Sequence, residues 1–227
     1  MSVLGMISSY EEEWIKKFDP QKRLVTGSAY LIAKRFMDLF IVLIALPFWL
    51  PVIGLIALVI RVTSPGAPVM FKQLRTGKGG QRFKMYKFRS MVPNAEELKA
   101  KYAYLNELQW PDFKITNDPR ITPIGCFLRK TSLDELPQLF NILTGEMSLV
   151  GPRPTSFGPE TYKLWHTERL DVAPGLTGLW QIIGRAQLEF DDRLRLDIAY
   201  IDRRSLWLDI SILIYTVMAV FKQRGAH

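Results

Sequence analysis

The sequence predicts an α+β fold, mainly helical, built on a helical hairpin that enters and leaves a membrane on the same side. A 22-residue segment from Leu39 to Ile60 has no charged or strongly polar side chain. Two short patterned runs, 69–74 and 82–88, flank the glycine-rich turn TGKGG and predict a small β-hairpin. The remaining periodic segments favour helices, some of them amphipathic and close to the membrane surface.

The apolar segment is the strongest of these signals. A straight helix of that length would measure about 33 Å, which is enough to cross a bilayer. The segment starts too late for a secretory signal, and it ends in Arg61 rather than in a small-residue cleavage site. A buried core helix is the alternative, but a domain of this size seldom conceals so long an apolar run. We therefore expect a membrane anchor.

Two prolines at the centre of the segment predict that it bends back. Pro47 and Pro51 each remove a backbone donor and clash with the preceding turn, so a sharp break is expected there. Lys34 and Arg35 precede the segment and further basic residues follow it, and positive residues mark the cytoplasmic side. A re-entrant hairpin over about residues 36–62 is therefore favoured over a span.

Chain length and helix-capping and turn residues predict how the rest of the chain is organised. A polar arm over residues 1–29 is expected to precede one domain over residues 30–227. Helices are predicted from Asn94 to about Leu108 behind a capping box with Glu97, and at Ser132–Leu143, Pro159–Leu170 and Phe190–Ile201.

The C-terminal segment Ser205–Phe221 is also strongly apolar, although it contains Asp209. Trp207 and Tyr215 suit the interface between lipid and water, which favours a helix on the membrane surface. An ordinary C-terminal core helix fits the pattern equally well, and both interpretations stay open.

Composition limits the chemistry. Hydrophobic residues make up 48% and charged residues 23% of the chain, which excludes a disordered or low-complexity protein. Cys126 is the only cysteine, so an intrachain disulfide and a CxxC site are excluded. The two histidines cannot form a multi-histidine metal cage, and His166 is interpreted as a packing or surface residue. Catalysis must use carboxylates, lysines, arginines and hydroxyls.

Charge is concentrated in one place. The net charge is +8, and the stretch from Met70 to Ser90 contains seven basic residues and no acid. A local anion site or a surface against anionic lipid fits this pattern. Lys87 and Arg89 alternate with apolar residues, so their side is expected to be buried against an anionic partner. Nucleic acid is the rival partner, but no recognition helix or aromatic strand of the RNP type accompanies the charge.

Two adjacent carboxylates are the best catalytic candidates. Asp134 and Glu135 precede Pro137, which is tolerated only near a helix start, where backbone N–H groups are free. A simple capping box from Ser132 to Glu135 is the structural alternative. Arg129 lies just upstream, and adjacent helical side chains diverge by about 100°. One nucleophile and one base or metal ligand is the division of labour we expect.

Two turn-rich stretches contain further cationic candidates. Arg153 lies between two prolines, and a guanidinium held so rigidly suits bidentate binding of phosphate, although a structural salt bridge fits as well. Gly175, Gly178 and Gly184 form a compact loop set with Arg185, which is weaker evidence for a site.

Taken together, these motifs resemble the bacterial sugar transferase family, the monotopic polyprenyl-phosphate phosphoglycosyl transferases. The resemblance runs from about Tyr30 to the C-terminus. The motifs that carry it occur in this order: KRFMD, the proline-broken apolar segment, FKMYKFRSM, DPRITPIGCFLRKTSLDELPQLFNIL, GEMSLVGPRP and PGLTGLWQIIGR. Family members often have a Ser-Pro pair at the helix break, where this chain has Leu50-Pro51.

The resemblance implies transfer of a sugar 1-phosphate from a UDP-sugar to undecaprenyl phosphate, with release of UMP. This reaction is the first membrane step of exopolysaccharide, capsule or O-antigen synthesis, and the C-terminal motifs resemble members that use UDP-glucose or UDP-galactose. The family dyad falls on Asp134, the expected nucleophile of a covalent aspartyl-phosphosugar intermediate, and on Glu135. Both residues are expected to bind the cofactor Mg²⁺.

The resemblance also implies a substrate site and a location. The family's basic and PRP motifs place Lys87, Arg89 and Arg153 around the diphosphate, and Arg129 and Arg185 complete the expected substrate-binding set. The protein is expected on the cytoplasmic face of the bacterial inner membrane, in contact with lipid and without nucleic acid, and homodimerisation is left open. The rival hypothesis is a non-catalytic membrane-anchored adaptor that binds anionic lipid or nucleic acid.

Overall fold

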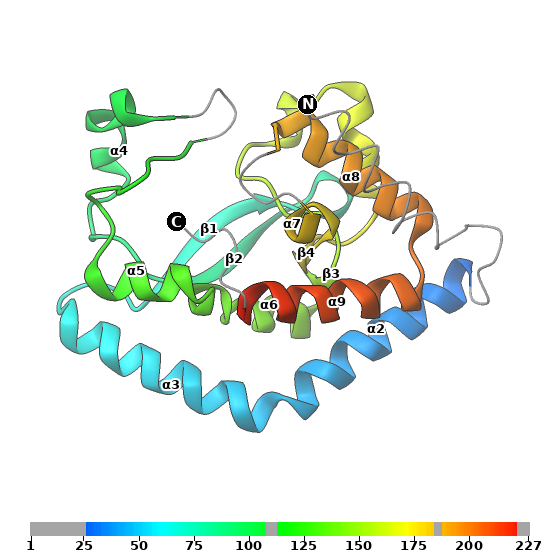
Figure 1. The fold of residues 1–227 in the computed structure, drawn as a ribbon, viewed down its shortest axis with the longest axis horizontal. Coiled ribbons are helices and arrows are strands. Elements are labelled where there is room, and N and C mark those ends of the chain that lie inside the picture. Colours follow the sequence, from blue (N-terminus) through cyan, green and yellow to red (C-terminus); the bar gives the residue numbers. More distant parts are fainter. Residues whose placement is uncertain (1–25, 108–112, 184–187, 222–227) are drawn as a thin grey trace.

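A computed structural model describes residues 26–107, 113–183 and 188–221, which fold mainly into helices with two small β elements (Figure 1). The helices are α2 (Gly27–Ile44), α3 (Leu46–Thr63), α4 (Glu97–Lys101), α5 (Pro123–Lys130), α6 (Gln138–Thr144), α7 (Leu179–Ile183), α8 (Phe190–Arg203) and α9 (Leu206–Phe221). The strands are β1 (Met70–Thr76), β2 (Arg82–Phe88), β3 (Ser148–Val150) and β4 (Gly175–Thr177).

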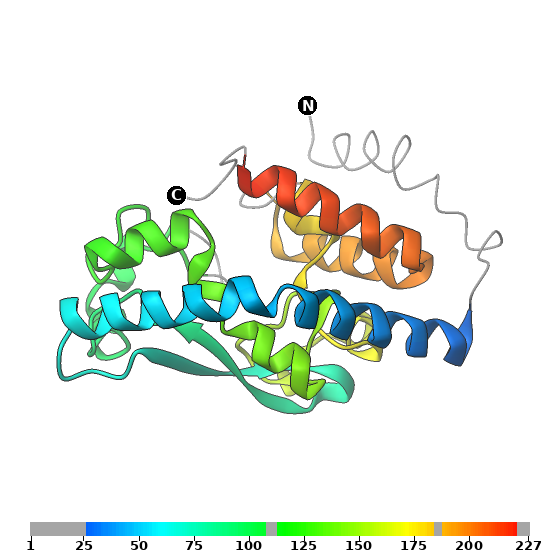
Figure 2. The same ribbon diagram turned by 90° about the horizontal axis from the view of Figure 1, so that it is seen from below.

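Helices α2 and α3 form two 18-residue arms that meet at Ala45 and run along one whole edge of the molecule (Figures 1 and 2). The arms diverge from the bend at an open angle. The re-entrant membrane hairpin expected over about residues 36–62 is not confirmed. Helix α2 also begins earlier than predicted, since it includes Gly27 to Ala29, which the sequence assigned to the polar arm over residues 1–29.

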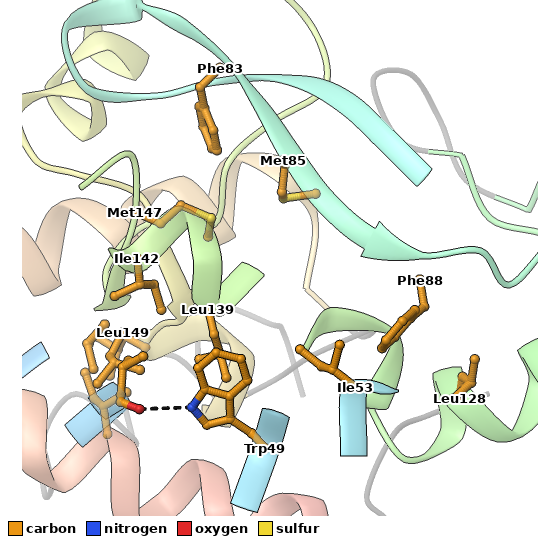
Figure 3. Close-up of a cluster of buried hydrophobic side chains, with 14 of the residues drawn as sticks. Trp49, Ile53, Phe83, Met85, Phe88, Leu128, Leu139, Ile142, Met147 and Leu149 are labelled. Carbon is orange, nitrogen blue, oxygen red and sulfur yellow. Dashed lines mark hydrogen bonds between the residues drawn. The ribbon is translucent and has the colours of Figure 1, made fainter. Parts of the chain in front are cut away.

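The bend lies one turn earlier than the prolines suggested. Pro47 is in the first turn of α3, where its missing N–H costs little, and Pro51 lies inside α3 without ending it. The buried Trp49 closes the bend, since its indole Nε1 donates a hydrogen bond of 2.9 Å to the backbone oxygen of Val42 (Figure 3). A side chain thus satisfies a carbonyl next to the interruption.

The two arms present different faces to the body and to the outside. Val42, Trp49 and Ile60 are buried against the body. On the outer face Ile32, Phe36, Phe40, Phe48, Leu55, Leu58 and Val62 are each more than half exposed. Among the described residues, α3 is the helix long and apolar enough to cross a membrane. So many exposed apolar side chains on two adjoining helices indicate a contact with lipid or with another protein.

The predicted β-hairpin is confirmed. Strands β1 and β2 pair antiparallel with Met70 opposite Phe88 and Thr76 opposite Arg82. Phe83 and Met85 of β2 face the core, above Ile142 and Met147 (Figure 3).

Two segments far apart in sequence form a second sheet that the sequence did not predict. Strand β3 runs parallel to β4, with Ser148 opposite Gly175. Gly175 is required here, because a Cβ at that position would lie 2.1 Å from the backbone nitrogen of Gly151. The GPRP and PGLTG motifs therefore lie directly against each other.

Some of the predicted helices are confirmed and others are not. Those predicted at Phe190–Ile201 and Ser205–Phe221 are confirmed as α8 and α9. The helix predicted at Pro159–Leu170 is wrong, since that segment forms separate 3₁₀ turns. The helix predicted from Asn94 is shorter than expected and lacks the capping box, because α4 begins at Glu97 without a side-chain cap. In α9, Leu208 and Ile212 belong to the core, whereas Trp207 and Val217 are exposed, so the helix has a core face and an exposed apolar face.

A buried polar layer joins α2 to the body, and we call it the anchor seam. It consists of Tyr30, Lys34, Arg35, Asp38, Ser148, Tyr200 and Asp209. Asp209 accepts hydrogen bonds from the hydroxyls of Tyr30 (2.9 Å) and Tyr200 (2.7 Å) and forms an ion pair with Lys34 (3.0 Å). Every charge in this cluster thus has a partner on another element.

Two more contacts complete the anchor seam. Asp38 accepts hydrogen bonds from the Ser148 hydroxyl (2.7 Å) and from the backbone N–H of Leu149 (3.2 Å). Arg35 donates to the carbonyls of Ile142 (2.6 Å) and Leu143 (2.9 Å) near the C-terminus of α6, which a cation stabilises. Lys34 and Arg35, interpreted from sequence as a cytoplasmic flank, are therefore engaged inside the protein.

Candidate active site

The two adjacent carboxylates lie in a tight turn between α5 and α6. Ser132 adopts a left-handed conformation with φ 58°, and a single 3₁₀ turn follows at Leu133–Glu135. Pro137 then occupies the N-cap of α6, so the single helix predicted over Ser132–Leu143 is wrong: the carboxylates precede α6, which begins only at Gln138. The capping box does not form, because the Ser132 side chain makes no cap hydrogen bond and Glu135 binds cations instead. The turn frees both carboxylates to line a cavity.

Glu135 is held by two cations from different elements. Lys87 of β2 donates from Nζ to Oε1 at 2.7 Å. Arg153, in the loop after β3, donates from Nη2 to the same oxygen and from Nη1 to Oε2 at 3.3 Å. Both carboxylate oxygens of Glu135 are therefore occupied.

The environment drives the two neighbouring carboxyl groups in opposite directions. Burial alone would raise the pKa of Glu135, but Arg153 and Lys87 outweigh burial and hold that pKa well below its ordinary range. Burial raises the pKa of Asp134, against the attraction of Lys87. Asp134 accepts no hydrogen bond from the described residues, and only 8% of its surface is exposed. Opposite pKa shifts in two adjacent carboxyl groups indicate that Asp134 and Glu135 have separate roles.

The fold fixes Lys87 relative to the dyad through a buried asparagine. Asn141 of α6 accepts a hydrogen bond from the backbone N–H of Tyr86 (3.1 Å) and donates one to the carbonyl of Lys84 (2.9 Å). The helix that follows the dyad is thus bonded directly to the strand that contains Lys87.

The loop with Arg153 is fixed from both sides. Its base rests on the glycine contact between β3 and β4, and its tip is bonded to the hairpin. The N–H of Thr76 donates to the carbonyl of Thr155 at 3.0 Å, and Arg82 donates to the carbonyls of Ser156 and Phe157. Arg82 is therefore a tether for this loop.

Two more predicted cations line the same cavity on the side of α5. Arg129 donates from Nε to the hydroxyl of Ser90 at 2.8 Å, and its charge acts on Asp134. Arg89 is 9% exposed, and its buried Nη1 has no hydrogen-bond partner. Gly125 allows α5 to approach, because a Cβ there would lie 1.9 Å from the carbonyl oxygen of Ser90.

The cavity around the dyad is large and has two kinds of lining. Its volume is about 2180 Å³, well above the roughly 300–1,000 Å³ of a typical small-molecule site. Charged side chains surround the dyad, whereas apolar residues of α9 and β1 line other parts of the wall. The apolar lining includes Met70, Phe71, Leu213, Val217, Met218 and Val220. Such a space can hold a charged group together with an apolar one.

Comparison with known proteins agrees with this geometry. The family described as bacterial sugar transferase matches residues 29–223, which is most of the chain. The chain belongs to the bacterial sugar transferase family. The match begins within α2, so it includes the anchor seam as well as the dyad.

Several curated relatives are similar in sequence to this sugar transferase. A galactosyl transferase, CpsE, of Streptococcus agalactiae is 44% identical over 87% of the chain, and the undecaprenyl-phosphate galactose phosphotransferase of Salmonella typhimurium is 43% identical over 91%. The chain spans 44% of the length of each. The exopolysaccharide production protein ExoY of Rhizobium meliloti is 39% identical over 86% of the chain and 88% of its own length.

The structure brings together most of the site residues that the sequence of this sugar transferase predicted. Asp134, Glu135, Lys87, Arg89, Arg129 and Arg153 all line one cavity. Arg185 lies outside the described residues. Arg75 of β1, which the sequence showed only as one of seven clustered basic residues, lines the cavity as well.

The carboxylates of this sugar transferase could bind Mg²⁺ through Asp134. Within the described residues, no group of three or more His, Cys, Asp or Glu side chains is arranged to hold a metal ion. Glu135 has both oxygens engaged by cations, so Asp134 is the available protein ligand. Mg²⁺ is commonly held by one or two carboxylates together with substrate phosphates and water. The donor set fits that mode, and Glu135 could join it only by releasing a cation.

Proposed function

We propose that this sugar transferase moves a sugar 1-phosphate from a UDP-sugar, UDP-glucose or UDP-galactose, to undecaprenyl phosphate and releases UMP. The observation that carries the proposal is the asymmetric dyad, in which Glu135 is saturated by cations and Asp134 is free inside a cation-lined cavity. The relatives support the substrate class, since their names include transferases from UDP-galactose or UDP-glucose to a lipid carrier.

The reaction proceeds in two displacements at phosphorus. A carboxylate oxygen of Asp134 attacks the β-phosphorus of the UDP-sugar, and the bond from that phosphorus to the bridging oxygen breaks, so UMP leaves with the electron pair. The product is an acyl phosphate between Asp134 and the sugar phosphate. An oxygen of the lipid phosphate then attacks the same phosphorus, and the Asp134 carboxylate is released. Such covalent catalysis divides one transfer into two easier steps.

The surrounding charges make the first displacement feasible. A carboxylate that approaches a diphosphate is repelled by its negative charge unless cations neutralise the phosphates. Lys87, Arg129 and Arg153 are close enough to act on Asp134, and they are the groups we assign to this task. Mg²⁺, which Asp134 would hold, would supply additional neutralisation of the phosphate charge. Glu135 holds Lys87 and Arg153 in place beside the nucleophile.

The apolar surfaces support a membrane-bound enzyme. The outer faces of α2 and α3 expose a continuous set of large apolar side chains, which we place in the cytoplasmic leaflet of the inner membrane. The apolar wall formed by α9 and β1 would receive the first isoprenoid units, while the lipid phosphate reaches the dyad. A non-catalytic adaptor would need neither a buried free carboxylate nor its cations.

The test is to trap the covalent intermediate. Enzyme, Mg²⁺ and labelled UDP-sugar are mixed without lipid acceptor, and the label is mapped by mass spectrometry. We expect a phosphosugar on Asp134 and one equivalent of UMP. Asp134→Asn should give neither, and Glu135→Gln should be severely slowed but able to form some adduct. A reaction that requires both substrates at once, with no adduct at any time, would show direct displacement instead.

A further inference from the structure

The hairpin adds a cation to the site that no expected role explains. Arg75 of β1 lines the dyad cavity, and its charge acts on both Glu135 and Arg153. Its two terminal nitrogens donate to neutral oxygens, Nη1 to the carbonyl of Pro154 (3.1 Å) and Nη2 to the side chain of Gln73 (2.6 Å). Its Nε is buried and has no hydrogen-bond partner.

This arrangement is unfavourable for an empty protein. A buried cation costs free energy unless a carboxylate or another anion faces it, and a buried donor without an acceptor adds to that cost. Burial lowers the pKa of Arg75 to about 10, and repulsion by Arg153 contributes to the decrease. Glu135, the carboxylate whose charge acts on Arg75, is already shared by Lys87 and Arg153. Positive charge therefore exceeds negative charge at this end of the cavity.

A purely structural role does not require the charge. Arg75 contacts the loop that contains Arg153, but that loop is already tied to the hairpin by Thr76 and Arg82. The hydroxyl of Thr76 donates to the carbonyl of Phe157 at 2.7 Å, and Arg82 donates to the same carbonyl at 2.8 Å. A neutral side chain at position 75 could keep the contact with Pro154.

We propose that Arg75 binds a substrate phosphate, with Arg153 on the other side of the same group and Gln73 orienting the guanidinium. The site would take a phosphate monoester or diphosphate, and its unused Nε–H would donate to a phosphate oxygen. This inference rests on the proposed function, in which two substrates present such a group, the UDP-sugar and the polyprenyl phosphate. Guanidinium groups suit this task because their donors match phosphate geometry.

The test compares Arg75→Gln with two matched variants of the same hairpin. Lys84→Gln removes one charge from an exposed position that does not line the cavity. Arg82→Gln removes a loop tether, and a tether is expected to change stability and kcat rather than KM. For Arg75→Gln we expect KM for one substrate to rise roughly 10- to 100-fold, as for the loss of one hydrogen bond to a charged group. Arg75→Lys should restore part of the loss.

The two half-reactions identify which phosphate is bound. If Arg75 holds the donor diphosphate, adduct formation from UDP-sugar alone requires correspondingly higher concentrations. If Arg75 holds the lipid phosphate, adduct formation is unchanged and only KM for polyprenyl phosphate rises.

A binding experiment separates this inference from the proposed function. Titration of the wild-type enzyme with inorganic phosphate should detect a site that weakens at least 10-fold in Arg75→Gln and is unchanged in Lys84→Gln. If the wild type shows no transfer at all, the proposed function fails, and the phosphate titration still decides the role of Arg75. Unchanged phosphate affinity together with unchanged KM for both substrates would overturn the assignment, as would a variant that only reproduces the behaviour of Arg82→Gln.

Discussion

Buried charge occurs in two regions of this sugar transferase, and the two regions balance it differently. In the anchor seam, Asp209 faces Lys34 and two tyrosine hydroxyls, and Asp38 accepts two hydrogen bonds. In the dyad cavity, four cations act on two carboxylates. Lys87, Arg129 and Arg153 act on Asp134, and Arg75 acts on Glu135.

The difference separates structure from function. A buried charge that faces an opposite charge or hydrogen-bonding groups holds elements in one arrangement, and removal of one of these partners lowers the free energy of unfolding. An excess of buried charge of one sign is tolerated where a ligand of opposite charge binds. The anchor seam should therefore respond to mutation through folding, and the dyad cavity through turnover.

The largest expected effect is at Asp209. Asp209→Ala leaves Lys34 without its counter-charge and two tyrosine hydroxyls without their acceptor, so we expect a loss of about 3–5 kcal/mol in the free energy of unfolding. Thermal unfolding in detergent measures this change. Asp202→Ala, which removes an exposed acid from α8, serves as the control and should change little. Equal stability of the two variants would show that the anchor seam does not hold α2 to the body.

The anchor seam also shows where sequence reasoning reached its limit. Asp209 was visible as a single acid in an apolar segment, which signals a buried partner, but its partner Tyr30 is 179 positions away. The parallel pairing of β3 with β4 was missed for the same reason, since it joins segments without a local turn. The hairpin β1–β2 was predictable because its two strands flank one glycine-rich turn.

The site was predicted in its members but not in its arrangement. Asp134 and Glu135 were found as a pair, but their division of labour depends on Lys87 and Arg153, which arrive from separate elements. The bend at Ala45 likewise depends on a side chain, the Trp49 indole that reaches back to Val42. Local sequence patterns predict candidate residues and short elements, whereas tertiary contacts determine which of them lie side by side.

The second prediction concerns Arg153. Arg153→Ala removes a cation that acts on Asp134 and holds Glu135, so kcat should fall roughly 100- to 1,000-fold, as for loss of one preorganised charge in an active site. Binding to vesicles should not change, and the unfolding temperature should fall less than in Asp209→Ala, because Glu135 keeps Lys87. Lys78→Ala, at the turn of the hairpin, removes the same charge and should leave turnover intact. Parallel losses of membrane binding in both variants would indicate attraction to lipid instead of a substrate site.

The smallest effect is expected at Lys34, where stability and topology can be read together. In Lys34→Met, Asp209 keeps the hydroxyls of Tyr30 and Tyr200, so the loss should be about 1–3 kcal/mol, smaller than for Asp209→Ala. Arg61→Met removes an exposed flanking charge from α3 and should not change stability. Thermal unfolding ranks the three variants.

The same two variants test whether docking or charge orients the anchor. Cysteines at positions 28 and 78, in a chain whose exposed Cys126 is replaced by serine, report the side of the membrane through an impermeant thiol reagent applied to intact cells. Because Lys34 is engaged inside the protein, both positions should stay protected in Lys34→Met and in Arg61→Met. Labelling of position 28 alone in Lys34→Met would mean that the flanking charge sets the topology. Labelling of either position in the otherwise unmodified chain would establish a span and rule out the proposed one-sided insertion.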